Sequence, residues 1–184
     1  MAIEKYVTKC IVIESYDRGE HDRVYKLFTR EYGMVLAHAK SIRKLESKLR
    51  AHVRPRSVAL VTLVQGKEVW RLVGAEEEKE SSHAIHDVAH LVGRFIKGEG
   101  AHKALYDRLE QFLVGSPSYD AQKVRLLLYY VVLVELGYAD AKVIGVKDLQ
   151  EYISFSLSDL YTHLLLSYDI VRAHTQAVLK EVQL

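Results

Sequence analysis

The chain has 184 residues, of which 49% are apolar, and a formal net charge of +2. This length allows one large domain or two small ones, and the apolar fraction is high enough for a packed core. The charge is unevenly distributed, because residues 1–74 hold fifteen Lys and Arg against eight Asp and Glu, a net +7. Residues 75–184 hold eleven against sixteen, a net −5. We therefore expect two modules, of which the basic one is the candidate for binding a polyanion.

The chain contains one cysteine, Cys10, which lies in an apolar run and is expected to be buried. A single cysteine excludes an internal disulfide framework and a CxxC zinc site, which favours a reducing, intracellular setting. The N-terminus lacks a signal-peptide pattern, and the most hydrophobic run, Leu126–Val134, is far shorter than the roughly 20 residues of a membrane span. We therefore expect a soluble, cytoplasmic protein.

The first 74 residues have the pattern of short strands separated by turn residues. The expected strands are Tyr6–Tyr16, Val24–Thr29, Met34–Ile42, Val58–Val64 and Glu68–Val73. Between the third and fourth of them, the four-residue spacing of Leu45 and Leu49 predicts one or two helical turns over Lys44–Ala51, before Pro55. Five strands with a helix in this place predict an OB-fold barrel, with an SH3-like barrel as the alternative.

A change in composition follows, since Glu76–Glu78 and Ser81–Ser82 form a polar segment that we interpret as a hinge. Beyond it, apolar residues recur with helical spacing. The expected helices are Ile85–Ile96, Ala101–Leu113, Ser118–Leu136, Val146–Ile153 and a last one that begins at Ser156 and continues through Val171. The fold class is therefore α+β with two domains: a barrel over residues 1–75 and an all-α helical bundle over residues 81–184.

Sequence motifs of catalysis are absent. The chain has no GxxxxGK[ST] or GxGxxG phosphate loop, no GxSxG and no HExxH. His83, His86 and His90 share one side of a helix, but that side is opposite the apolar stripe, so we interpret it as a polar outer face rather than a metal site. Nothing in the sequence argues for an enzyme or a cofactor.

The strongest functional signal is a run of cations within the β module. Between residues 40 and 56 a single acid, Glu46, faces seven basic residues: Lys40, Arg43, Lys44, Lys48, Arg50, Arg54 and Arg56. Such cations pair with phosphates, while exposed aromatic rings stack on bases. Tyr25 and Tyr32 are open candidates for stacking, and Phe28 is expected in the core.

Three ordered motifs in the first third of the chain resemble a known family. They are Gly19-Glu20-x-Asp22-Arg23-Val24, Leu27-Phe28-Thr29-Arg30-Glu31-x-Gly33 and Ala39-Lys40-x-x-Arg43-Lys44-x-x-Ser47-Lys48-Leu49-Arg50. In this order they resemble the N-terminal domain of the bacterial recombination mediator RecO. More weakly, Leu126–Tyr138 resembles the helix of that family that ends in Leu-Gly-Tyr.

The resemblance implies an OB-fold domain followed by a helical domain, in a non-enzymatic protein of DNA repair and recombination. Family members bind single- and double-stranded DNA, anneal complementary strands, and act with RecR and the single-strand-binding protein to load RecA. Basic residues of the barrel contact DNA in the family, and they correspond here to Arg30, Lys40, Arg43, Lys44, Lys48 and Arg50. Arg54 and Arg56 extend this set on physical grounds alone.

The chain also departs from the family pattern. Many members have a four-cysteine zinc site after the Gly-Tyr pair, but residues 137–145 contain no cysteine, so we expect no zinc. The helical part is shorter than is usual in the family. This puts in doubt the family contacts of the helical domain, including its pocket for the acidic tail of the single-strand-binding protein.

Two other functions fit the same residues. One is a general OB-type module that binds single-stranded DNA or RNA without recombination partners. The other is an adaptor whose cations meet an acidic protein. DNA binding with strand annealing distinguishes a RecO-like mediator from both.

Overall fold

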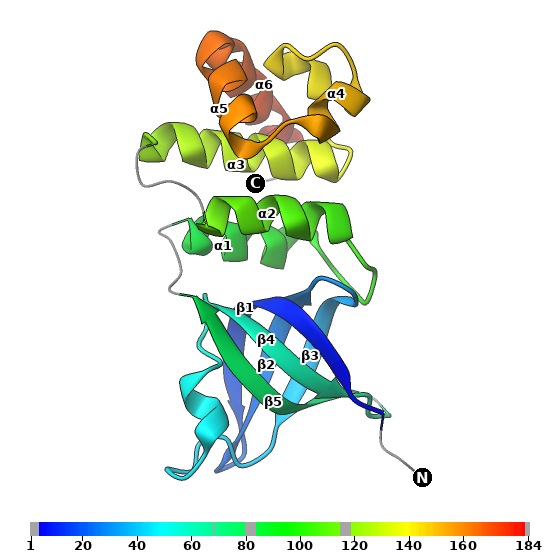
Figure 1. Cartoon of the computed structure of the whole chain (residues 1–184), viewed down its shortest axis with the longest axis vertical. Coiled ribbons are helices and arrows are strands. Elements are labelled where there is room, and N and C mark those ends of the chain that lie inside the picture. The colour runs from blue at the N-terminus through cyan, green and yellow to red at the C-terminus, as the bar shows by residue number, and fades with distance from the viewer. Residues whose placement is uncertain (1–3, 68, 80–83, 115–118, 183–184) are drawn as a thin grey trace. The chain divides into compact units, whose positions relative to one another are not determined.

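The structure is a computed structural model that describes residues 4–67, 69–79, 84–114 and 119–182. Its first element is a closed antiparallel barrel with one parallel pair, in the order β1-β2-β3-β5-β4 (Figure 1). The strands are β1 (Tyr6–Arg18), β2 (Asp22–Thr29), β3 (Gly33–Ala39), β4 (Val58–Val64) and β5 (Trp70–Lys79). A short 3-10 helix, η1 (Lys48–Ala51), lies between β3 and β4. The predicted OB-fold is confirmed, including the place of its helix.

Side chains alternate between the two faces of these strands, and the barrel interior takes one set. On β2, for example, Tyr25 and Leu27 belong to the interior core, whereas Phe28 faces outward and packs against Tyr106 with ring centroids 5.7 Å apart. Phe28 is buried, as predicted for a core residue. The barrel therefore has apolar side chains both inside it and on its outer face, where Phe28 meets Tyr106.

The acidic segment predicted as a hinge is instead part of a strand. β5 continues to Lys79, and Glu76 and Glu77 are opposite Leu60 and Ala59 of β4. Main-chain hydrogen bonds with β4 hold this segment, and those bonds do not depend on which side chains the segment has. Ser81 and Ser82 lie outside the described residues.

The rest of the described chain is helical. The helices are α1 (Ile85–Phe95), α2 (Lys103–Val114), α3 (Ala121–Glu135), η2 (Ala141–Ile144), α4 (Leu149–Ser154), α5 (Leu157–Leu166) and α6 (Tyr168–Glu181). The α3 helix is the one expected to be central, and its residues Leu127–Val134 are buried apart from Tyr129. The predicted capping box is present, because Ser156 and Asp159 bond reciprocally at the start of α5. None of the helices in the described parts of the chain is long and apolar enough to cross a membrane.

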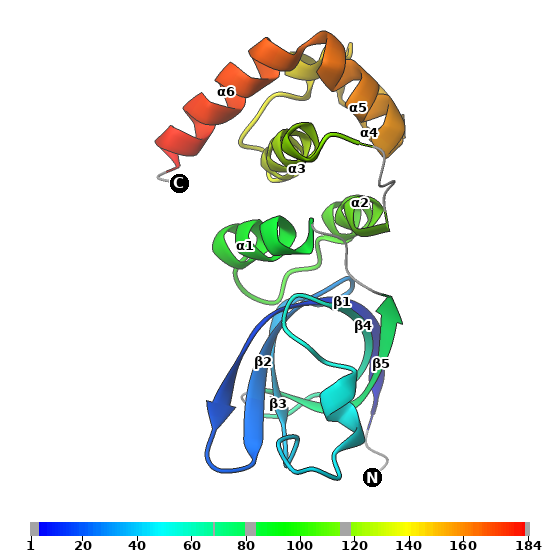
Figure 2. The same cartoon turned by 90° about the vertical axis from the view of Figure 1, so that its left-hand side faces the viewer.

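The prediction of a single last helix is wrong, since two helices replace it. The α5 helix ends at Leu166, and Ser167 separates it from α6 although no proline or glycine stands at this point (Figure 2). Both α5 and α6 pack against α3. At 1.5 Å per residue, α3 is about 22 Å long and a straight helix spanning both partners would be about 37 Å. The bend at Ser167 therefore keeps both helices on α3.

The chain divides into two compact units, residues 1–107 and residues 108–184. The α1 helix belongs to the first unit because it packs against β1. The segment after α1 also approaches the barrel: Met34 donates its amide to Gly98 at 3.0 Å, and a side chain at Gly33 would collide with the backbone of Gly100. The predicted domain boundary at residues 75–81 stays a prediction.

Candidate nucleic-acid interface

The cations cluster on the connection between β3 and β4, residues 40–57, which we call the basic loop. Asp22 fixes its start by accepting a hydrogen bond from the Ser41 amide at 2.7 Å and by pairing with His38 at 2.9 Å. The Ser41 hydrogen bond is the main reason why the pKa of Asp22 lies below its usual value. Arg43 donates its amide to His21 at 3.0 Å. The loop is therefore held against the turn between β1 and β2.

Apolar residues of the basic loop turn toward the barrel and leave the cations outside. Ile42 and Val53 are buried in the barrel core, Val53 with 2% of its surface exposed, and Leu49 packs against the same core. In Figure 2 the loop runs past η1 at one end of the barrel and returns along the barrel to β4. The loop is thus a fixed, charged surface rather than a solvated tail.

Three arginines of this region line one cavity of about 290 Å³, which we call the arginine pocket. Its walls are Arg23, Tyr25, Ile42, Arg43 and Arg50. Arg23 pairs with Asp17 at 2.8 Å, and Arg43 approaches the same carboxylate at 3.4 Å. Within the described residues, Arg50 makes no ion pair. Three guanidinium groups with one shared carboxylate leave a net positive cavity that suits a phosphate.

The other predicted contacts of the basic loop surround this pocket or follow it. Lys40, Lys44 and Lys48 are exposed, and the described part of the chain gives Lys44 and Lys48 no ion-pair partner. Arg54 and Arg56 lie on the returning part of the loop, where Arg56 donates its amide to Val12 at 2.6 Å. Seven of the eight predicted residues therefore belong to one loop, although they do not all share one face.

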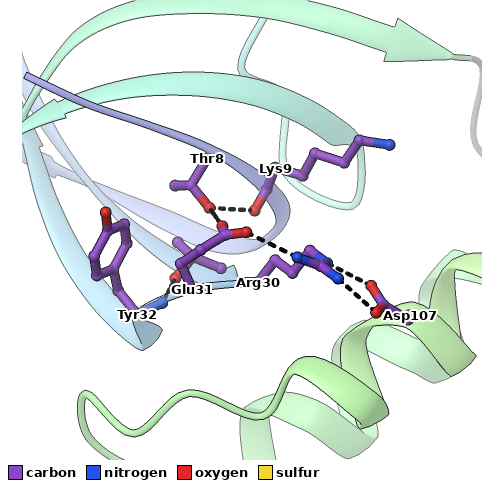
Figure 3. Close-up of polar contacts among 7 residues, drawn as sticks. Thr8, Lys9, Arg30, Glu31, Tyr32 and Asp107 are labelled. Atoms are coloured by element: carbon purple, nitrogen blue, oxygen red, sulfur yellow. Dashed lines mark hydrogen bonds and ion pairs between the residues drawn. The ribbon is translucent and has the colours of Figure 1, made fainter.

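Arg30 lies apart from the other seven, in the turn between β2 and β3. It donates to both carboxylate oxygens of Asp107 on α2, at 2.6 and 2.8 Å, and to Glu31 at 3.1 Å (Figure 3). These bonds raise the pKa of Arg30, and the bonds to Asp107 contribute most. Arg30 in turn lowers the pKa of Asp107. Arg30 and Lys40 flank opposite ends of β3, about 23 Å of strand. Arg30 therefore serves a contact within the first unit.

The candidate stacking residues are less available than the sequence suggests. Tyr25 is 1% exposed, so its ring cannot receive a base, and burial raises the pKa of its hydroxyl. Tyr32 is half-buried in a cluster with Tyr6 and Trp70, with ring centroids 5.2 to 5.7 Å apart. The interface at the basic loop thus consists of cations.

Arg23 is the residue that the sequence did not assign to the interface. In the sequence it could equally pair with a neighbouring acid, and the structure shows both roles at once: it pairs with Asp17 and lines the arginine pocket. The available signal was strand parity. Arg23 is two residues before Tyr25, so both side chains turn to the same side of β2.

The second unit has a pocket of a different kind, of about 460 Å³, between α3 and α6. It combines two arginines, Arg125 and Arg172, with apolar and aromatic walls that include Leu126, Tyr129, Tyr168 and Leu179. We call it the α3–α6 pocket. The Arg125 guanidinium lies 5.8 Å from the centre of the Tyr129 ring. Thr175, also in its wall, is 1% exposed, and its hydroxyl has no hydrogen-bond partner among the described residues.

In the described parts of the chain, no three His, Cys, Asp or Glu side chains are grouped so that they could hold a metal ion. His86 and His90 are exposed on α1, and His83 lies outside the described residues. The expected absence of zinc stays a prediction.

Comparison with known proteins shows which family the N-terminal part of the chain is similar to. Residues 1–77 match the family model described as "Recombination protein O N terminal". The comparison confirms the resemblance to RecO. Proteins named "DNA repair protein RecO" are similar: that of Heliobacterium modesticaldum is 38% identical over 81 residues, and that of Dehalococcoides mccartyi strain CBDB1 is 34% identical over 71 residues. These alignments cover 44% and 39% of this chain.

A third such protein, from Thermoanaerobacter sp. strain X514, is 30% identical over 111 residues, or 58% of this chain. The three alignments cover 29%, 28% and 45% of the respective RecO proteins. The matched part of this chain therefore spans less than half the length of each of these relatives. The part of the chain that matches the family model contains nearly all of the barrel and the basic loop.

Proposed function

We propose that this chain acts in DNA repair as a RecO-type recombination mediator that binds single- and double-stranded DNA without catalysing a reaction. The observation that carries the proposal is the arginine pocket with the basic loop around it, on a barrel similar to the RecO N-terminal domain. The proposed DNA contacts are Lys40, Arg43, Lys44, Lys48 and Arg50, with Arg54 and Arg56 as extensions. Arg23 joins them, and Arg30 contributes only if DNA displaces Asp107.

The proposed mechanism is electrostatic. Lys44, Lys48 and Arg50 have no ion pair within the described residues, so phosphates that bind them displace only water and counterions. Neutralising two phosphate backbones lowers their mutual repulsion and lets complementary strands approach and anneal. The guanidinium groups of the arginine pocket can hold one phosphate through parallel hydrogen bonds, which fixes the path of the backbone. No cofactor is needed for these steps.

The proposed protein partners are RecR and the single-strand-binding protein, through which RecA loading is directed. RecR rests on the resemblance alone. For the acidic tail of the single-strand-binding protein, the α3–α6 pocket offers a site, because Arg125 and Arg172 can pair with carboxylates while Leu126 and Leu179 receive an apolar side chain. This local chemistry outweighs the net negative charge of the helical part, which acts at longer range and is screened by salt.

The proposal is tested by binding and annealing across a salt series. Labelled single-stranded DNA, duplex DNA and RNA are titrated with the chain, and the annealing of complementary strands is timed without ATP. We expect binding to both DNA forms, a steep salt dependence and faster annealing. The loop variant R43E/K44E/K48E/R50E should lose binding and annealing, while its circular dichroism spectrum remains that of the parent.

A matched control distinguishes local from global charge. The variant K142E/K147E/R172E/K180E makes the same change in net charge on the second unit, and it should bind and anneal as the parent does. If the loop variant binds DNA as well as the control, the assignment of the interface is wrong. Equal affinity for RNA together with no annealing would favour the general single-strand-binding module instead.

A further inference from the structure

A second cationic hollow lies in the first unit, away from the arginine pocket. It has a volume of about 370 Å³ and lies where α1 meets β1 and β2; we call it the α1 groove. Five basic side chains line it against one acid, Glu14. The five are Lys26, Arg56, His86, His90 and Arg94.

The groove has a defined construction. Gly93 lets α1 approach β1 closely, since a Cβ at this position would lie 3.0 Å from Cγ2 of Ile13. Lys26 bridges the gap, with its ammonium group 3.2 Å from Glu14 and 3.3 Å from the Gly93 carbonyl. The His86 and His90 side chains are one helical turn apart and exposed beside this bridge. Both histidines line the groove, and neither takes part in the hydrogen bonds of Lys26.

The α1 groove and the arginine pocket lie on different faces of the same strand. Arg23 and Lys26 are three residues apart on β2, about 10 Å, and an odd spacing points their side chains to opposite faces. Arg56 connects the two sites in the chain, because it is the last cation of the basic loop and lines the α1 groove. One loop therefore supplies cations to two separate surfaces.

The lining indicates what kind of ligand fits. Protein partners usually insert an apolar or aromatic anchor, and among the groove's lining only Ile13 and Ala89 are apolar side chains. A phosphodiester backbone needs only cations and hydrogen-bond donors, which the groove provides. An acidic protein segment is the weaker fit because its side chains would gain charge contacts but no anchor.

We propose that the α1 groove is a second phosphodiester-binding site, which holds one nucleic-acid strand while the basic loop holds another. This inference rests on the proposed function, and it gives annealing a structural basis. Two strands held on two faces of one unit are brought together at high effective concentration. Without the groove, the chain retains one strand and meets the second only by collision.

The test counts strands on the full chain. Short oligo(dT), which cannot pair with itself, is titrated and the complexes are weighed by native mass spectrometry. The parent should hold two strands per chain. The variant H86E/H90E changes exposed positions of α1 and should hold one strand, with its first affinity unchanged and annealing slowed. The control K142Q/K180Q changes the net charge equally and should hold two.

A second variant tests the groove without any change in α1, in case H86E/H90E alters that helix. R56G removes the guanidinium and keeps the backbone, because Arg56 has φ = 64° and glycine adopts that conformation freely. It too should lose the second strand. The inference is overturned if both variants still hold two strands, if the parent holds only one, or if poly-glutamate replaces the second strand at equal charge. Failure of the proposed function is distinct, since the loop variant would then keep the first strand.

Discussion

Arginine has opposite environments in the two units of this chain. In the first unit, Arg43 and Arg50 are exposed around a polar cavity. Arg43 lies 3.4 Å from Asp17 and donates to the Gly19 carbonyl at 3.2 Å, and Arg50 makes no ion pair within the described residues. In the second unit, Arg108 is 6% exposed and donates to the main-chain carbonyls of Tyr152, Ile153 and Phe155 at the C-terminal end of α4. The same residue type therefore serves a candidate interface in one unit and internal structure in the other.

The environment of Arg108 explains why it cannot also serve as a surface cation. Its guanidinium lies 3.9 Å from Glu135 and 5.5 Å from the centre of the Tyr152 ring. Burial raises the pKa of Glu135, and Arg108 opposes that rise. What decides the role of an arginine is thus how far solvent reaches it, and the number of cations in a sequence segment does not reveal this.

The largest expected effect is the loss of stability when the buried arginine, Arg108, is replaced. R108M should lower the free energy of unfolding by about 3 kcal/mol, because it leaves Glu135 and three carbonyls without their partner. Urea unfolding followed by far-UV circular dichroism measures the change. The control R172M alters an exposed arginine of the same unit and should change stability by less than about 0.5 kcal/mol.

A loss for R108M no greater than that for R172M would mean that Arg108 is not a structural centre of the second unit. Nucleic-acid binding by R108M, measured well below its unfolding midpoint, should equal that of the parent, since this arginine does not reach solvent.

The next largest effect concerns the arginine pocket. R43A/R50A should weaken binding of single-stranded DNA at least about tenfold. The removal of each guanidinium deletes a charge-assisted hydrogen bond to the phosphate that is worth about 1.5 kcal/mol or more. The slope of log K against log salt should fall by about 0.7, the value for one phosphate contact with a single strand. Stability should stay within about 0.5 kcal/mol of the parent.

The alanine pair K142A/K180A is the matched control and should leave the salt slope unchanged. A salt slope equally steep in R43A/R50A would show that the pocket holds no phosphate, whatever its affinity. The proposed DNA contacts of the first unit would then be the lysines of the basic loop.

A moderate effect is expected at the α3–α6 pocket. R172E should weaken binding of an acidic peptide that ends in an apolar residue about tenfold, by replacing an attraction with a repulsion. Binding of single-stranded DNA should not change, since Arg172 belongs to the other unit. Fluorescence anisotropy of both labelled ligands measures the two effects in one preparation. Equal losses for peptide and DNA would indicate that the two pockets do not differ in ligand class.

The barrel was predictable from the sequence because its signals are local. Alternation and turn residues located all five strands, β4 to the residue. The helix predicted over Lys44–Ala51 is present over Lys48–Ala51, and Leu45 lies outside it. The bend at Ser167 was not predictable, because no local residue causes it. It follows from the length of α3, against which both neighbouring helices pack.

The candidate site was only partly predictable for a related reason. The basic loop is contiguous in sequence, so its cations were identified together. Whether a cation is already paired depends on segments far away in the chain: Arg30 meets Asp107, 77 positions later. Arg23 depends in the same way on the loop that closes over it. Sequence motifs indicate which cations are near one another, and the fold determines which remain available.

The smallest expected effect concerns that engaged cation, Arg30. Asp107 has a lowered pKa in the folded state, so its ion pair stabilises the fold above the unfolded pKa of about 3.9 and the contribution is lost as the pH falls through the folded value. R30Q should therefore shift the urea midpoint downward slightly at pH 7, and this shift should shrink as the pH falls below the unfolded pKa of about 3.9. The effect is small because both side chains are partly exposed.

D107N should reproduce the pH dependence of R30Q, and the double variant should show little further change, since both remove one interaction. R30Q should also reduce DNA affinity less than R50A does, because Arg50 has no ion pair to give up among the described residues and Arg30 must first leave Asp107. A larger loss of affinity in R30Q than in R50A would reverse this order. It would mean that DNA displaces Asp107 and that the turn between β2 and β3 belongs to the interface.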